Sequence, residues 1–151
     1  MDAVVIYWSK TGNTEKVARA LSDGLALGGA DVRLVALAEA AELDYFNYDL
    51  VCMGFPAYGW LPPQPVMDRL KAKHKLYGGA GRVRWSTPEV AGTQALVFVT
   101  YSGPHTGINE ALPAGKVAGQ FFEHLGIRVL DEVYVVGEFH GREEASTQGR
   151  L

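Results

Sequence analysis

Along the chain, short runs of consecutive apolar residues alternate with longer segments in which apolar residues recur with the period of a helix. Apolar residues fill three short segments almost completely: 3–8, 49–54 and 95–100. Strands that are covered by helices on both faces have this continuous pattern. The segment 31–36 alternates polar and apolar residues instead, which indicates a strand nearer the edge of a sheet. A fifth strand is predicted within 128–139, centred on 133–136.

Between these segments, apolar residues recur every three or four positions, which is the period of an amphipathic helix. The predicted helices span 13–27, 65–76 and 114–125, with a short helical turn within 39–43. In the second helix, Lys71, Lys73 and Lys75 are expected to face outward. The segment 77–93 contains four glycines and is predicted to be a mobile loop or a small hairpin.

The order of these elements predicts the fold class. Strands that alternate with helices favour an α/β protein with right-handed crossovers and a doubly wound, five-stranded parallel sheet. A chain of 151 residues with 48% hydrophobic residues suits one globular domain, spanning 1–151. Within that domain, 140–151 is expected to be a polar tail.

Charge, cysteine and histidine content narrow the function classes. The formal net charge of −3 and the lack of a basic stripe argue against a nucleic-acid partner. The single cysteine, Cys52, lies in an apolar run and is expected to be a buried, inert thiol. The first apolar run has no basic leader, so a cytoplasmic protein without membrane insertion is expected. The four histidines lack metal-ligand spacing, and Ser102 lies in no hydrolase motif.

The first strand passes into the first helix through the loop Ser9-Lys10-Thr11-Gly12-Asn13-Thr14. Free N–H groups and the helix dipole favour an anion at a helix N-terminus. Gly12 lets the backbone approach such an anion closely. The simpler interpretation is that Ser, Thr and Asn cap the helix. One cap needs one such residue, and this loop has four, so the loop is predicted to bind phosphate.

The pattern S-x-T-G-N-T between a strand and a helix resembles the FMN-phosphate loop of the flavodoxin family. The resemblance covers the chain to about Phe139. It implies FMN as the cofactor and the strand order 2-1-3-4-5, with the ligand at the carboxyl edge of the sheet. The loop is not a Walker A motif, because the G-x-x-x-x-G-K-[ST] order is absent.

The resemblance places the loops after the first, third and fourth strands together around FMN. The loop 9–14 would hold the phosphate. Tyr58, Trp60 and Tyr101 would stack on the flavin ring, or else pack inward, and His105 would reach the ring edge or face solvent. The candidate cofactor-binding residues are Ser9, Lys10, Thr11, Gly12, Asn13, Thr14, Pro56, Ala57, Tyr58, Gly59, Trp60, Thr100, Tyr101, Ser102, Gly103 and His105. No catalytic residue and no metal ligand is predicted.

The resemblance also gives Gly59 a role. In flavodoxins a glycine peptide of this loop turns so that its carbonyl accepts a hydrogen bond from the half-reduced flavin, and the Tyr58–Gly59 peptide matches it by position. Glycine tolerates the positive φ that such a turn requires. The surrounding stretch, 55–63, contains three prolines and is expected to be loop throughout.

A flavodoxin-like sheet normally has a fifth helix beside the first, and the polar segment 140–151 is too short to supply it. The last helix is therefore expected to be missing or truncated, as in an excised domain. Part of the apolar face of the first and third strands would then be open. A second copy of the chain or another covering partner is expected at that face.

The resemblance favours an FMN-binding one-electron carrier between redox partner proteins. One alternative is an FMN-dependent NAD(P)H oxidoreductase that acts on a quinone or similar acceptor, with 77–93 lining its substrate pocket. A second alternative is a non-redox module that binds a phosphorylated ligand through the loop 9–14. The flavin domain of a larger flavoprotein also fits.

Overall fold

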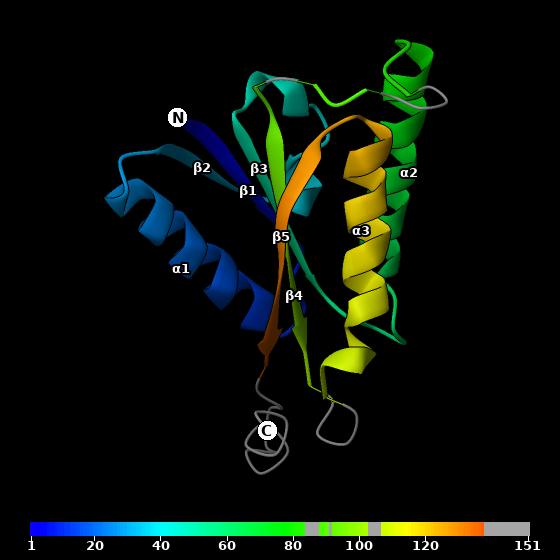
Figure 1. The fold of residues 1–151 in the computed structure, drawn as a ribbon. Helices are drawn as coiled ribbons and strands as arrows, with labels where there is room; N and C mark the ends of the chain where they lie inside the picture. Colours follow the sequence, from blue (N-terminus) through cyan, green and yellow to red (C-terminus); the bar gives the residue numbers. More distant parts are fainter. Residues whose placement is uncertain (84–87, 91, 103–106, 138–151) are drawn as a thin grey trace.

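The computed structural model describes residues 1–83, 88–90, 92–102 and 107–137. Five parallel strands form one sheet in the order β2-β1-β3-β4-β5, which confirms the expected fold (Figure 1). The strands are β1 (Asp2–Tyr7), β2 (Asp31–Ala36), β3 (Leu50–Pro56), β4 (Gln94–Tyr101) and β5 (Arg128–Val136). The central strands β1 and β3 are almost entirely buried, because helices cover both faces of the sheet there.

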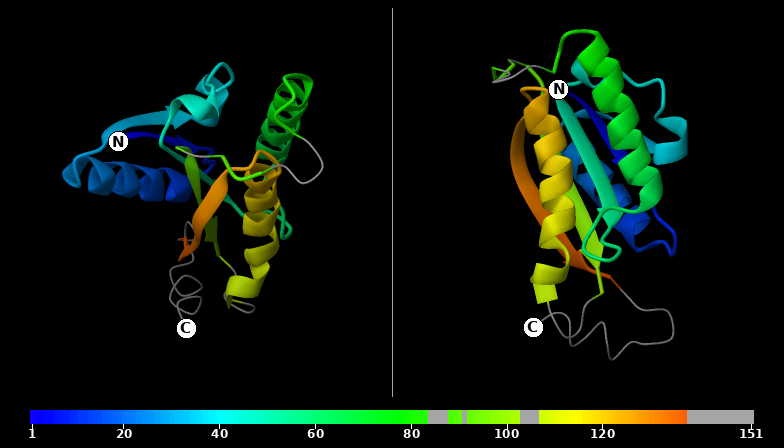
Figure 2. Two further views of the ribbon diagram at one scale, coloured as in Figure 1. Left: turned by 45° about the horizontal axis from the view of Figure 1, so that its top comes forward. Right: turned by 90° about the vertical axis from the view of Figure 1, so that its right-hand side faces the viewer.

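Three α-helices in the described part of the chain cover the sheet. α1 (Asn13–Leu27) lies on one face, and α2 (Gln64–Gly79) and α3 (Leu112–His124) lie side by side on the other (Figure 1 and Figure 2). Short 3-10 turns occur at Leu37–Glu39, Tyr45–Asn47 and Gly107–Glu110. None of the described helices is long and apolar enough to cross a membrane.

The two faces of the sheet bury cores of different size. The face under α2 and α3 holds the larger cluster, which includes Phe55 and Phe122. The face under α1 holds a smaller cluster around Val5, Cys52 and Phe98. Cys52 is fully buried, as expected, and burial raises the pKa of its thiol to about 12. The thiol therefore stays protonated at neutral pH.

The prediction of loop throughout 55–63 is wrong at the beginning of that stretch. β3 continues through Phe55 and Pro56, and Pro56 pairs with Thr100 of β4. Proline has no N–H to donate, but β1 pairs with β3 only as far as Gly54. No carbonyl group of β1 therefore needs an N–H from position 56, and the strand tolerates the proline.

Lys73 points inward, contrary to the prediction for the second helix. The residue is 3% exposed, its ammonium group donates to the carbonyl of Leu43, and it lies 5.1 Å from the centre of the Tyr45 ring. Burial lowers the pKa of Lys73. The carbonyl and the aromatic face compensate for lost water, which allows a cation on a buried helix face. Lys71 and Lys75 are exposed, as expected.

The apolar face that was expected to be open is buried. Val5 of β1 and Cys52 of β3 lie under α1 and are fully buried. Exposed apolar positions lie on β5 instead, where Leu130 is 48% exposed and Val133 is 37% exposed. The segment 138–151, on which the prediction of a missing last helix depends, lies outside the described residues.

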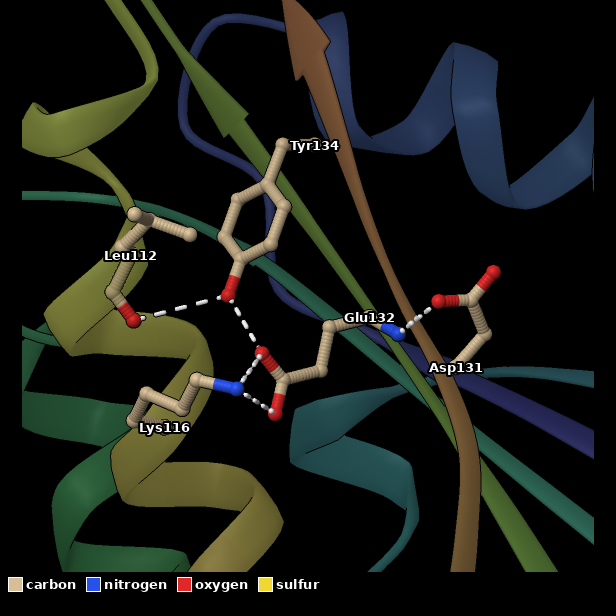
Figure 3. A network of polar contacts seen from close by, with 5 residues as sticks. All are labelled: Leu112, Lys116, Asp131, Glu132 and Tyr134. Carbon is tan, nitrogen blue, oxygen red and sulfur yellow. Dashed lines mark hydrogen bonds and ion pairs between the residues drawn. The ribbon is translucent and has the colours of Figure 1, made fainter.

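A polar network fixes β5 to α3 (Figure 3). The Tyr134 hydroxyl donates to Oε2 of Glu132 at 2.7 Å and lies 3.4 Å from the carbonyl oxygen of Leu112. Lys116 Nζ lies 3.0 Å from the same carboxylate oxygen of Glu132. The tyrosine fits because α3 has Gly115 at this point, where a Cβ atom would lie 2.1 Å from the Tyr134 hydroxyl oxygen. β5 is therefore held firmly close to its carboxyl end.

Candidate functional site

The carboxyl edge of the sheet contains a cavity of about 350 Å³. Ligand pockets in proteins typically have volumes of about 300–1,000 Å³. The loop after β1, the ends of β3 and β4, and the residue after β5 contribute the lining: Ser9, Lys10, Thr11, Asn13, Thr14, Pro56, Ala57, Tyr58, Thr100, Tyr101, Ser102 and Gly137. Four segments that are far apart in the chain therefore meet at one site.

The first loop enters α1 through a glycine. Gly12 is the N-cap residue and has a φ of +99°, in the left-handed region that favours glycine. Its N–H donates to Ser9 Oγ at 3.1 Å, which closes the loop on itself. Gly12 has no side chain, so the N-cap residue itself supplies no side-chain cap to α1. Asn13 and Thr14, in the first turn of α1, line the cavity.

A buried hydrogen bond ties the first loop to β4. The hydroxyl oxygens of Thr14 and Thr100 lie 2.7 Å apart, and both residues are almost fully buried. One hydroxyl donates its proton to the oxygen of the other. The accepting hydroxyl keeps its own proton, which it can donate to another acceptor. The pair fixes the first turn of α1 against the carboxyl end of β4, and both residues line the cavity.

The second loop is a two-residue hairpin, which also departs from the prediction of loop throughout 55–63. Tyr58 N–H donates to Leu61 O at 2.8 Å, and Leu61 N–H donates to Tyr58 O at 3.1 Å. Gly59 and Trp60, at the tip, have φ of +54° and +67°. Positive φ at both central residues defines a type I′ turn. Among the described residues, Trp60 is the only one other than glycine with positive φ.

The aromatic side chains of the hairpin do not pack into the core. Trp60 is 62% exposed and Tyr58 is 44% exposed, so the alternative of inward packing is wrong for both. The Trp8 ring supports Tyr58 in an edge-on contact, with 5.8 Å between ring centres and 89° between ring planes. Desolvation raises the pKa of the Tyr58 hydroxyl. Tyr101 is half-buried and lines the cavity from the end of β4.

Most of the predicted site residues line this cavity. Gly12, Gly59 and Trp60 belong to the first and second loops but do not line it. Gly103 and His105 lie outside the described residues.

The sequence prediction missed two residues of the site. Trp8 supports the Tyr58 ring, and Gly137 lines the cavity. Each stands immediately after a strand of the sheet. A position directly after a predicted strand was the sequence signal that could have identified both residues, because the carboxyl ends of parallel strands meet at one edge of the sheet.

The described lining residues supply hydrogen-bond donors and aromatic surface. They contribute hydroxyl and amide groups and one exposed cation, Lys10, and they include no histidine, cysteine or carboxylate side chain. Across the described ranges, no group of three or more His, Cys, Asp or Glu residues could hold a metal ion. Neutral donors beside exposed aromatic rings fit an anion joined to a flat ring system.

Comparison with known proteins points to one family. The family model described as flavodoxin matches residues 5–147. A flavodoxin from Clostridium beijerinckii is 34% identical over 55 residues, which make up 36% of this chain. That matched part spans 40% of the length of the Clostridium protein.

Solved structures agree on the fold. Oxidised flavodoxin 1 from Bacillus cereus gives a TM-score of 0.70 at 16% identity, over 99% of this chain and 95% of that one. Rubredoxin oxygen:oxidoreductase from Desulfovibrio gigas gives a TM-score of 0.65 at 18% identity, over 99% of this chain and 34% of that one. The fold of this chain therefore also occurs as one part of a longer chain.

Proposed function

Because the chain belongs to the flavodoxin family, we propose that it binds FMN in the cavity at the carboxyl edge and carries single electrons between partner proteins. Members of this family bind FMN. One observation carries the proposal: a loop of neutral hydrogen-bond donors and an aromatic hairpin meet at the same cavity. A ligand with a phosphate at one end and a flat ring at the other needs that combination.

The loop 9–14 would hold the phosphate. The hydroxyls of Ser9, Thr11 and Thr14 and the amide of Asn13 are neutral donors, and backbone N–H groups of the first turn of α1 add to them. Hydrogen bonds to a charged group contribute about 1.5–3 kcal/mol each. Several such bonds together offset part of the entropy lost on association.

The aromatic residues would hold the ring. Tyr58 and Tyr101 line the cavity, Trp60 is exposed at the tip of the hairpin, and Trp8 keeps the Tyr58 ring in place. When bound, FMN supplies the redox chemistry. The protein positions the ring, and the exposed hairpin leaves one side of the site open to a redox partner.

We assign the turning peptide of the hairpin to Gly59–Trp60 rather than to Tyr58–Gly59. The Tyr58 carbonyl already accepts from Leu61 N–H, whereas Gly59–Trp60 is the central peptide of the turn. Rotation of the central peptide converts a type I′ turn into type II′ and keeps both hydrogen bonds that close the hairpin. It moves φ of Trp60 from +67° to about −80°, which relieves strain. The Gly59 carbonyl would then accept a hydrogen bond from the reduced ring.

The alternative of an NAD(P)H oxidoreductase gains no support from the segment 77–93. Its described residues lie at the amino edge of the sheet, away from the cavity. Arg82 N–H donates to Tyr77 O, and Val90 N–H donates to Gly126 O, just before β5 begins.

An anaerobic reductive titration of the FMN-loaded protein tests the proposal, with the potential of each electron measured separately. We expect two well-separated one-electron potentials, and no oxidation of NADH or NADPH in the absence of a partner protein. A single two-electron step with rapid oxidation of NADH or NADPH would establish a reductase instead. Binding of phosphate compounds without any binding of flavin would establish the non-redox module.

A further inference from the structure

We propose that Gly137 is a positioning residue for the phosphate end of the cavity. Because Gly137 has no side chain, the Asn13 amide can occupy the space beside it. The amide in that position makes the site selective for a ligand with a terminal phosphate. The inference rests on the proposed function, because it assumes that the loop 9–14 holds the phosphate.

The contact between the two residues is close. Gly137 is buried, directly follows β5 and lines the cavity together with Asn13. A Cβ atom on Gly137 would lie 2.9 Å from Asn13 Nδ2, 3.1 Å from Cγ and 3.3 Å from Cβ. These distances include the base of the Asn13 side chain as well as its tip. A small shift of the terminal amide would therefore not make room for a methyl group.

Gly137 itself has little freedom to retreat. Its N–H donates to Tyr101 O at 2.7 Å, which joins the end of β5 to the end of β4. Three residues earlier, the Tyr134 network holds β5 against α3 (Figure 3). The N–H of Gly137 and the strand that leads to it are thus both held in place. An added methyl group would be accommodated by rotating the Asn13 side chain out of its present position.

Rotation of Asn13 would remove one donor from the phosphate end and leave the ring end unchanged. The three atoms nearest to a Cβ atom on Gly137 all belong to Asn13. Phosphorylated and unphosphorylated forms of the same ligand should consequently respond differently to a change at this glycine.

The test measures the affinity of FMN and of riboflavin for the full chain, for Gly137→Ala, for Asn13→Ala and for the double variant. We expect Gly137→Ala to weaken FMN by about ten- to a hundredfold, the value of one charge-assisted hydrogen bond, and to leave riboflavin unchanged. Asn13→Ala should cause a similar loss. The double variant should bind FMN as Asn13→Ala does, because no amide remains to be displaced.

Gly24→Ala provides a matched control, since a Cβ atom on Gly24 of α1 would meet nothing within 4 Å. It should leave both affinities unchanged. If Gly137→Ala fails to fold, the double variant decides the matter, because Asn13→Ala removes the contacts at 2.9 and 3.1 Å and leaves only the Cβ contact at 3.3 Å. Folding of that variant with the FMN affinity of Asn13→Ala supports the proposal, and a further loss of FMN affinity overturns it.

Equal effects of Gly137→Ala on FMN and riboflavin, or additive effects of the two substitutions, would overturn the role of Gly137. Both outcomes leave FMN binding by the unchanged chain intact. Failure of the unchanged chain to bind FMN would instead overturn the proposed function, so the two failures are distinguishable.

Discussion

The first loop, 9–14, and the hairpin, 58–61, border the same cavity and are built in different ways. The first loop is anchored in the fold, through the buried Thr14–Thr100 hydrogen bond and through Gly12 at the start of α1. The hairpin is closed by two hydrogen bonds between its own residues and carries exposed aromatic side chains. Its tip has positive φ at both central residues.

This difference separates two tasks. A loop that is anchored in the fold and offers several hydrogen-bond donors suits the holding of a phosphate, because its donors need little reorganisation when the ligand binds. A hairpin that keeps its closing hydrogen bonds while its central peptide turns suits the adjustment of a ring environment. Changes in the first loop should therefore alter affinity, and changes in the hairpin should alter reduction potentials.

The largest effect is expected for Thr14→Val. The substitution leaves the Thr100 hydroxyl buried without its partner, which should lower the free energy of unfolding by about 1–3 kcal/mol and weaken FMN as well. Thr93→Val is a matched control at the opposite edge, where the hydroxyl donates to Tyr48 O at 3.0 Å. Chemical denaturation and FMN titration should show a loss of stability in both variants, and a loss of FMN affinity only in Thr14→Val.

Thr11→Ala should have the next largest effect. Thr11 is exposed and lines the phosphate end, so the fold should remain stable while FMN binding weakens by about 1.5–3 kcal/mol. Riboflavin, which has no phosphate, should bind as before. Ser22→Ala on α1 is the control for loss of a hydroxyl outside the cavity. Equal losses for FMN and riboflavin would show that Thr11 does not contact the phosphate.

Gly59→Val tests the hairpin. Gly59 has a positive φ in both turn types, but type II′ requires glycine at this position whereas type I′ also accepts other residues, so a side chain should penalise the turned form more. If the turned carbonyl contributes about 1 kcal/mol, the first reduction potential should fall by about 40 mV. Gly29→Val, at φ +93° beyond α1, should cost similar stability without changing the potential. An unchanged first reduction potential in Gly59→Val would show that the hairpin does not influence this potential.

Trp60→Gly should have the smallest effect. Glycine accepts a φ of +67° without strain, so the type I′ turn should gain up to about 1 kcal/mol relative to type II′. The first reduction potential should fall by less than in Gly59→Val. Trp60→Phe keeps both an aromatic ring and the strained φ and should leave the potential nearly unchanged. A fall of equal size in Trp60→Phe would show that the effect comes from the loss of the indole ring and not from the turn.

Much of this arrangement was predictable, because it follows from periodicity and topology. Continuous apolar strands and amphipathic helices indicate a doubly wound sheet, and the ends of its parallel strands meet at one edge. The resemblance to the flavodoxin family adds the strand order and predicts that the polar loop 9–14 and the aromatic residues of 58–60 share one site.

The remaining features depend on tertiary contacts that local patterns do not contain. Lys73 is buried because the Leu43 carbonyl and the Tyr45 ring receive its ammonium group. Pro56 remains in β3 because β1 has already ended. The need for glycine at position 137 arises from Asn13, which is 124 positions earlier in the chain.

The most direct test of the account is a calorimetric titration of the full chain with FMN and with riboflavin under identical conditions. Several phosphate hydrogen bonds of about 1.5–3 kcal/mol each predict that FMN binds at least about a hundredfold more tightly than riboflavin. Equal affinities for the two ligands, or no binding of FMN, would contradict the assignment of the phosphate to the loop 9–14.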